Sequence, residues 1–258
     1  MALDSEITIN GKKFGFNLAS GTDISMVLKP NQPNVNCYYA QNPESEIIRA
    51  GDFVGSVAEG GPVNYNLLRL IPHGNGTHTE CYGHIAPNPE ATLSNCLKKF
   101  HFIGRLVSIT EIAIEGQDTY ITASQLEYKL KRNTLPVEAL IIRTLPNRTE
   151  KLNAQYSGTN PTYFEPACGK MLAEAGITQL ILDLPSFDRE EDEGLLAAHK
   201  GFWQYPANIR TDACITELVY IPDSVPDGYY MVNIQTINIH SDASPSRVVL
   251  YPLNELPG

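Results

Sequence analysis

The chain has 258 residues, 42% of them hydrophobic and 19% charged, a length and composition that suit one domain with a sizeable core. Its formal net charge of −10 argues against a nucleic-acid surface, and no apolar run approaches the length of a membrane span. The first residues carry no signal segment, and the five cysteines lack Cys-x-x-Cys spacing, so reduced thiols are expected. We therefore expect one domain over residues 1–258 in the cytoplasm.

The first half of the chain predicts a hairpin, a long loop and two strands. Residues 7–14 contain an Asn-Gly pair, which supplies the positive φ angles of a two-residue hairpin turn. Residues 29–43 are rich in proline and asparagine and are expected to form a loop. The apolar residues 63–71 predict a buried strand that delivers the histidine-rich segment after it, and residues 102–110 predict another strand.

Two capping signals in the middle of the chain predict helices with a strand between them. Thr122 and Gln125 have capping-box spacing, as do Thr162 and Glu165, and Gly176 is a natural end for the second helix. Apolar strands are predicted at residues 139–144 and 177–183, so this strand–helix–strand unit implies a right-handed parallel crossover.

The last third of the chain is rich in predicted strands. Residues 229–240 and 247–251 both have an extended pattern, whereas the acidic run 188–193 is interpreted as a solvated helix start. The whole pattern predicts a mixed α/β fold, with one parallel strand–helix–strand unit and extensive antiparallel strands.

The segment from His73 to His84 holds three of the six histidines. In an extended segment His78 and Glu80 point the same way, and His84 joins them if the extension continues. Imidazole and carboxylate groups on one side can bind Zn²⁺ or Mn²⁺. A lone His-x-Glu in a glycine-rich turn also arises easily by chance. Cys81 is a conceivable nucleophile, but strand alternation turns it away from this side.

A second pair of candidate ligands lies far along the chain. Residues 213–220 read as a strand with no polar face and with Glu217 in its middle. A buried carboxylate needs a cation, a metal or a proton, and an arginine partner is the ordinary alternative. His199 ends a short helix-like run, where it can equally be a capping or core histidine.

Together these residues resemble a known family. The pattern Gly76-Thr77-His78-x-Glu80-x-x-x-His84 is similar to the signature of the cyclase family of metal-dependent hydrolases, which includes bacterial kynurenine formamidase and isatin hydrolase. In that signature aspartate stands where this chain has Glu80. Three further segments resemble family elements, namely Asp23-Ile24-Ser25, residues 140–144 and residues 183–188.

The resemblance implies a swivelling β/α/β fold and hydrolysis of a C–N bond in a small amide or cyclic amide. His78, Glu80, His199 and Glu217 would bind a divalent metal, Zn or Mn, with Glu80 shared between two cations. His84 would be the catalytic acid–base residue. No organic cofactor is implied, the substrate would be a small molecule, and the protein would be a homodimer or homotetramer.

The chain departs from the family pattern at one ligand. The first histidine of the family signature corresponds to Gly74 here, and His73 precedes it by one residue. By strand parity His73 should face away from His78, so we expect it outside the metal site unless a bulge within residues 74–76 re-aims it. A missing ligand would suit a metal-poor pseudoenzyme that binds a small ligand. Another alternative is an enzyme that opens or closes a lactone or carbocycle.

Overall fold

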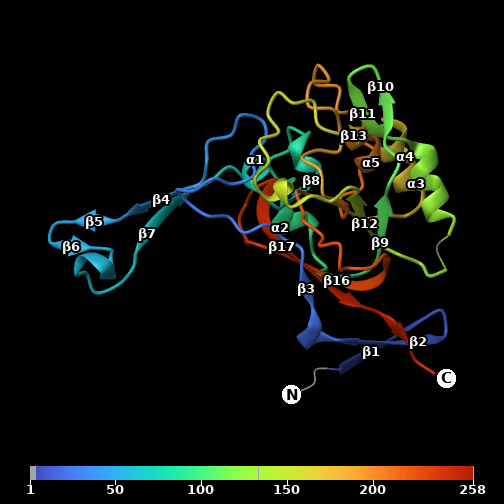
Figure 1. Ribbon diagram of the computed structural model, residues 1–258, viewed down its shortest axis with the longest axis horizontal. Coiled ribbons are helices and arrows are strands. Elements are labelled where there is room, and N and C mark those ends of the chain that lie inside the picture. The colour runs from blue at the N-terminus through green and yellow to red at the C-terminus, as the bar shows by residue number, and fades with distance from the viewer. Residues whose placement is uncertain (1–3, 133, 258) are drawn as a thin grey trace.

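The computed structural model describes residues 4–132 and 134–257, and its centre is an eight-stranded sheet (Figure 1). The strands follow one another in the order β16-β9-β12-β14-β15-β8-β17-β3. Their bounds are β3 (Thr22–Asp23), β8 (His78–Cys81), β9 (His101–Ile109), β12 (Ala139–Thr144), β14 (Gln179–Leu182), β15 (Cys214–Glu217), β16 (Gly228–Thr236) and β17 (Ala243–Pro252).

The middle of this sheet is parallel. Strand β12 pairs in parallel with β9 and β14, and β14 pairs in parallel with β15. All six residues of β12 are buried, which explains why its sequence is a continuous apolar run rather than an alternating one. The predicted strands at residues 139–144 and 177–183 and the mixed α/β class are confirmed.

Four antiparallel pairings connect β15 to β9 through β8, β17 and β16. Strand β8 lies between β15 and β17, and β17 pairs with β8 through Ala243–Pro245 and with β16 through Ser246–Pro252. Because β16 also pairs with β9, the hydrogen-bonded neighbours close into a ring. Strands β8 and β15 therefore have partners on both sides, and their residues are fully buried.

The helices begin where local capping permits. Helix α3 (Ala123–Leu130) has the predicted capping box between Thr122 and Gln125. Helix α4 (Ala167–Glu174) begins after Pro166, so the prediction of a helix opened by Thr162 is wrong. The carboxylate of Glu165 instead accepts a 2.8 Å hydrogen bond from the backbone N–H of Ala123, and it therefore caps α3. The remaining α-helices are α1 (Pro72–Asn75), α2 (Leu93–Cys96) and α5 (Ala197–Trp203).

Helices α4 and α5 lie in unusually close contact. A Cβ placed on Gly169 of α4 would lie 1.9 Å from the backbone oxygen of Ala198 in α5. Only glycine permits this approach of two helix backbones. The contact fixes where α5 sits, and Ala198 directly precedes His199.

No helix in the described ranges is long and apolar enough to cross a membrane.

Smaller sheets lie at the periphery. The predicted N-terminal hairpin is confirmed as β1 (Asp4–Ile9) and β2 (Lys12–Asn17), with φ angles of 49° at Asn10 and 79° at Gly11. It pairs with β18 (Asn254–Glu255) near both chain ends (Figure 1). The other elements are β10 (Ala113–Glu115), β11 (Asp118–Ile121), β13 (Tyr163–Phe164), η1 (Leu18–Ser20), η2 (Val57–Glu59), η3 (Tyr82–His84) and η4 (Thr149–Asn153).

A two-stranded ribbon projects from the body at the left of Figure 1. It consists of β4 (Glu44–Ile47) and β7 (Asn66–Arg69), with β5 (Arg49–Ala50) and β6 (Phe53–Val54) near its tip. All of β7 is exposed, so the prediction of a buried strand over residues 63–71 is wrong. Apolar content alone cannot tell a covered strand from an exposed ribbon, because the covering layer comes from elsewhere in the chain.

Candidate metal centre

The two predicted ligand pairs meet at the junction of β8 and β15. His78 and Glu217 are direct partners in the antiparallel register, and Nε2 of His78 lies 3.5 Å from Oε2 of Glu217. Both side chains are buried. Glu217 contacts histidines and the backbone N–H of Phe187, with no arginine against it among the described residues.

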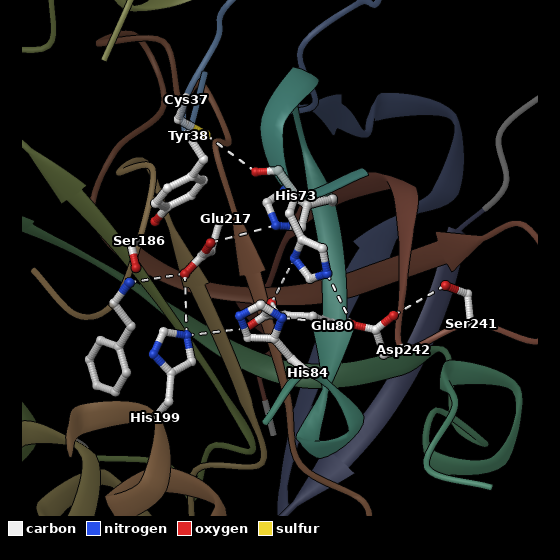
Figure 2. Close-up of polar contacts among 12 residues, drawn as sticks. Cys37, Tyr38, His73, Glu80, His84, Ser186, His199, Glu217, Ser241 and Asp242 are labelled. Atoms are coloured by element: carbon white, nitrogen blue, oxygen red, sulfur yellow. Dashed lines mark hydrogen bonds and ion pairs between the residues drawn. The ribbon is translucent and has the colours of Figure 1, made fainter. Parts of the chain in front are cut away.

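Glu80 occupies the middle of the cluster (Figure 2). Its side chain is 1% exposed, with Oε2 3.1 Å from Nδ1 of His73 and Oε1 3.2 Å from Nε2 of His199. His199 comes from α5, on the opposite side of the cluster from His73, and its Nε2 also lies 3.8 Å from Glu217. One carboxylate therefore links two groups of side chains.

His73 also belongs to this cluster, so the expectation that it faces away is wrong. Residues 72–75 form a helical turn rather than a strand, with Pro72 at its first position. A turn of 3.6 residues does not follow strand parity, and it aims His73 at Glu80. Gly74 packs elsewhere, since a Cβ on it would lie 2.3 Å from the Cβ of Ala40.

Each buried histidine makes a hydrogen bond through one ring nitrogen to an acceptor outside the cluster. Nδ1 of His199 lies 2.6 Å from Asp188, and Nδ1 of His78 lies 2.9 Å from the backbone oxygen of Gly76. Nε2 of His73, which is partly buried, similarly lies 3.0 Å from Asp242. The second nitrogen of each ring then faces inward, an arrangement typical of metal-ligating histidines.

The inward-facing atoms have the character of metal ligands. His78 Nε2 and Glu80 Oε1 are buried and have ion-pair contacts with Glu217 and His199, but neither atom makes a hydrogen bond within the part of the chain that is described. Leaving such groups unsatisfied costs about 1–3 kcal/mol each. Glu80 belongs to two sets of candidate ligands, one with His73 and His78 and the other with His199 and Glu217. Within each set the ligand atoms lie within 4.8 Å of one another. This donor set fits a divalent metal.

Crowded charges shift the pKa values at the cluster. Burial and the neighbouring Glu80 raise the pKa of Glu217 to about 8. Burial, reinforced by His73, lowers the pKa of His78 to about 4. Burial opposes the charged form of His199, but Asp188 and Glu80 outweigh it and raise its pKa to about 10. Two carboxylates thus share one buried space, and a bound cation would relieve their repulsion.

His84 has a different setting from the other three histidines. It lies in η3 with its side chain 32% exposed, and its Nδ1 is 3.8 Å from Glu80 and 3.7 Å from Asp242. These distances are too long for hydrogen bonds. His84 faces a cavity of about 320 Å³, which is also lined by Tyr38, His73, Glu80, Ser186, Arg189, Glu190, Asp192, Leu196, His199 and Glu217.

Sequence reasoning missed two carboxylates beside the cluster. The acidic run 188–193 forms no helix, and its first residue, Asp188, is buried rather than solvated. Its carboxylate accepts hydrogen bonds from the backbone N–H groups of Ala198 and His199, at the start of α5. The resemblance of residues 183–188 to a family element was the available signal. Asp242 precedes β17 in a turn, and no sequence pattern marks it.

Cys81 is a poor nucleophile in this setting. Its thiol is buried and contacts the backbone oxygen of Ala91 at 3.4 Å. A contact with Cys96 and burial both raise the pKa of the Cys81 thiol. The reactive thiolate is therefore disfavoured.

The fold and this cluster define a metal-dependent hydrolase-like protein. The family model described as “Putative cyclase” matches residues 22–189, more than half of the 258 residues, and the chain therefore belongs to the cyclase family. The match includes His73, His78, Glu80 and His84 and ends before His199.

Solved structures share the fold. Isatin hydrolase A from Labrenzia aggregata, bound to benzyl benzoate, has a TM-score of 0.65 at 17% identity, covering 91% of this chain and 96% of that chain. Isatin hydrolase A from Ralstonia solanacearum has a TM-score of 0.63 at 16% identity, covering 90% and 91%. A predicted metal-dependent hydrolase from Bacillus stearothermophilus has a TM-score of 0.61 at 15% identity, covering 90% and 98%. Among curated proteins, none matches this sequence.

Proposed function

We propose that the protein is a metal-dependent hydrolase that cleaves the C–N bond of a small amide or cyclic amide. The observation that carries this proposal is the buried Glu80 carboxylate, which belongs to two sets of ligand atoms and lies beside a buried His78 nitrogen without a hydrogen bond to any described residue. His73 and His78 would hold one divalent cation with Glu80, and His199 and Glu217 would hold another. Zn²⁺ or Mn²⁺ suits these ligands.

A cation bound there would lower the pKa of a water molecule and polarise the scissile carbonyl. The chain's own contribution to proton transfer is assigned to His84. Its imidazole lies on the cavity wall and makes no hydrogen bond with a side chain of the described ranges, so it is available to take a proton and give it to the leaving nitrogen.

The cavity supports a small substrate. A volume of about 320 Å³ is at the lower end of the usual range for ligand pockets. Tyr38 and Leu196 supply apolar surface on its wall, and Ser186 supplies a hydroxyl. The fold shared with isatin hydrolases supports a cyclic amide as the first substrate to test. The family resemblance also supports assigning the fold to the swivelling β/α/β type.

A pseudoenzyme would follow from a missing ligand at Gly74. His73, with Nδ1 3.1 Å from Glu80, is proposed to supply that ligand instead. The decisive experiment is elemental analysis of protein purified without chelators, followed by assays on isatin, an N-formyl arylamine, a cyclic imide and a lactone. We expect a stoichiometric divalent metal and hydrolysis of an amide that stops on chelation and returns with Zn²⁺ or Mn²⁺. Metal-free protein that cannot be loaded, or turnover of the lactone alone, would contradict the proposal.

The projecting ribbon supports a homodimer or homotetramer. A two-stranded ribbon is marginally stable alone in water, and this one exposes Tyr65 and Leu68 at 59% each. A second copy would present the same apolar surface and bury both. Light scattering should give a multiple of the 28.5 kDa chain mass, and Leu68→Glu should shift it toward the monomer.

Five free, buried cysteines support a reducing compartment such as the cytoplasm.

A further inference from the structure

We propose that Asp242 is a positioning residue of the metal centre, whose carboxylate fixes the ring of His73 so that Nδ1 faces Glu80 and His78. The proposal rests on the proposed function only in taking the cluster as a metal site. Nε2 of His73 lies 3.0 Å from Oδ2 of Asp242, while Nδ1 lies 3.1 Å from Oε2 of Glu80 (Figure 2).

Two possible sites compete for the same imidazole. Ligand atoms of His73 converge with those of His78 and Glu80 on one side, and with those of His84 and Asp242 on the other. A neutral ring has one N–H and one lone pair, so it can serve as ligand on one side while donating on the other. Asp242 takes the Nε2–H, which leaves the Nδ1 lone pair for the inner site.

Burial decides which side needs the lone pair. At the inner site His78 Nε2 is buried and has no hydrogen-bond partner among the described residues, and Glu80 is 1% exposed. At the outer site the side chains of His84 and Asp242 are 32% and 35% exposed, so water can satisfy them. An ion bound by His73 therefore gains more at the inner site.

The backbone holds Asp242 against the strand that carries Glu80. The backbone oxygen of Asp242 accepts a 3.0 Å hydrogen bond from the N–H of Cys81, the residue after Glu80 in β8. The preceding residue, Ser241, accepts a 2.8 Å bond from the N–H of Leu93 through its backbone oxygen and contacts Oδ1 of Asp242 with its hydroxyl at 3.3 Å. The backbone that carries the carboxylate is thus hydrogen-bonded to β8 and to the first residue of α2.

The same arrangement occurs at the other half of the centre. Asp188 holds Nδ1 of His199 at 2.6 Å, and Nε2 of His199 faces Glu80 and Glu217. Each proposed cation set therefore has one histidine oriented by an outer carboxylate. Such partners typically contribute about 10–100-fold in metal affinity.

The test measures metal affinity and histidine ring protons. Asp242→Ala should bind one of two Zn²⁺ ions about 10–100-fold more weakly in competition with a chromophoric chelator, and leave the other unchanged. Asp242→Asn, which keeps an oxygen acceptor, should restore part of the loss. Asp223→Asn removes an exposed carboxylate on another turn and should change neither ion.

In ¹⁵N-labelled protein, with or without metal, the Nε2–H of His73 should give a slowly exchanging proton signal that disappears in Asp242→Ala. If the wild type retains that signal but binds no Zn²⁺, the proposed function fails while the positioning contact stands. If Asp242→Ala keeps the signal and both Zn²⁺ affinities, Asp242 does not position His73. Equal losses at both ions would also overturn the proposal, because they would indicate a general structural effect.

Discussion

His78 and Glu217 stand opposite each other across β8 and β15, although most of the chain's helices and parallel strands lie between them in sequence. Their register places Nε2 of His78 3.5 Å from Oε2 of Glu217 with both side chains buried. A one-residue slip between these strands would send one of them to the other face of the sheet. The metal centre therefore depends on the pairing of the central sheet, and the ring of hydrogen-bonded strands holds that pairing in place.

His73→Ala should remove most of the metal from one of the two sets. The ring of His73 supplies one of three inner ligand atoms, and the other two cannot form a closed three-ligand site without it. Zn²⁺ stoichiometry after dialysis measures the loss. The matched control is His240→Ala, at an exposed histidine before the turn of Asp242. Full metal content in His73→Ala would show that the ring is not a ligand.

His84→Ala should keep the metal and lower turnover by about 10²–10⁴-fold, the usual range for loss of an acid–base group. The reason is its position on the cavity wall, with contacts of 3.7–3.8 Å that are too long for hydrogen bonds. Steady-state kinetics and elemental analysis on the same sample separate the two effects. Loss of metal would make His84 a ligand, and unchanged turnover would leave it without either role.

The parts of the site that could be predicted from sequence are those set by strand alternation and burial. His78 and Glu80 share a face, and an apolar strand around Glu217 signals a buried carboxylate that needs compensation. His199 and His84 required the family resemblance, because a single histidine in a helix or turn has many ordinary roles. The structure brings all five side chains to one place; their roles stay predictions.

The remaining features depend on contacts that local patterns do not encode. Strand parity predicts the wrong direction for His73, because Pro72 begins a helical turn over residues 72–75 and is itself a signal for such a turn. Asp242 reaches His73 only because β17 pairs beside β8, which no local pattern reveals. The buried central strands were predictable from their apolar runs. The exposure of the ribbon of β4 and β7 was not predictable, because its apolar sequence does not show whether another part of the chain packs over it.

The metal-free protein should lose stability as pH rises from about 6.5 to about 10. Burial opposes the charged forms of His73 and His199, but their carboxylate partners outweigh it and raise each pKa from 6.5 to about 10. The native state then keeps protons that the unfolded chain releases, so the free energy of unfolding falls with pH. Glu217, with its pKa raised from 4.5 to about 8 by burial and Glu80, adds to this fall below pH 8.

His78 has the opposite sign, because burial and His73 lower its pKa from 6.5 to about 4, but its contribution is complete by about pH 6.5. Metal affinity should rise over the range in which stability falls, since His73 and His199 must lose protons to bind the ion. Urea unfolding of chelator-treated protein at pH 6.5, 8 and 9.5, with Zn²⁺ titrations at each, measures both trends. Metal-free stability that increases between pH 6.5 and 9.5 would contradict the assigned contacts.

Gly169→Ala should destabilise the fold and weaken the metal set that contains His199. The added Cβ would lie 1.9 Å from the backbone oxygen of Ala198, so α4 and α5 must move apart, typically at a cost of about 1–3 kcal/mol. His199 follows Ala198 directly, and a shift of α5 carries its Nε2 away from Glu80, which lies 3.2 Å away. The control is Gly228→Ala, where the Cβ would meet only a ring carbon of Tyr230 at 4.0 Å. Gly169→Ala should lower both the free energy of unfolding in urea and the Zn²⁺ stoichiometry, whereas Gly228→Ala should change neither quantity. An unfolding free energy equal to that of the wild type would mean that the two helices have room to separate, and that their close contact does not set the position of His199.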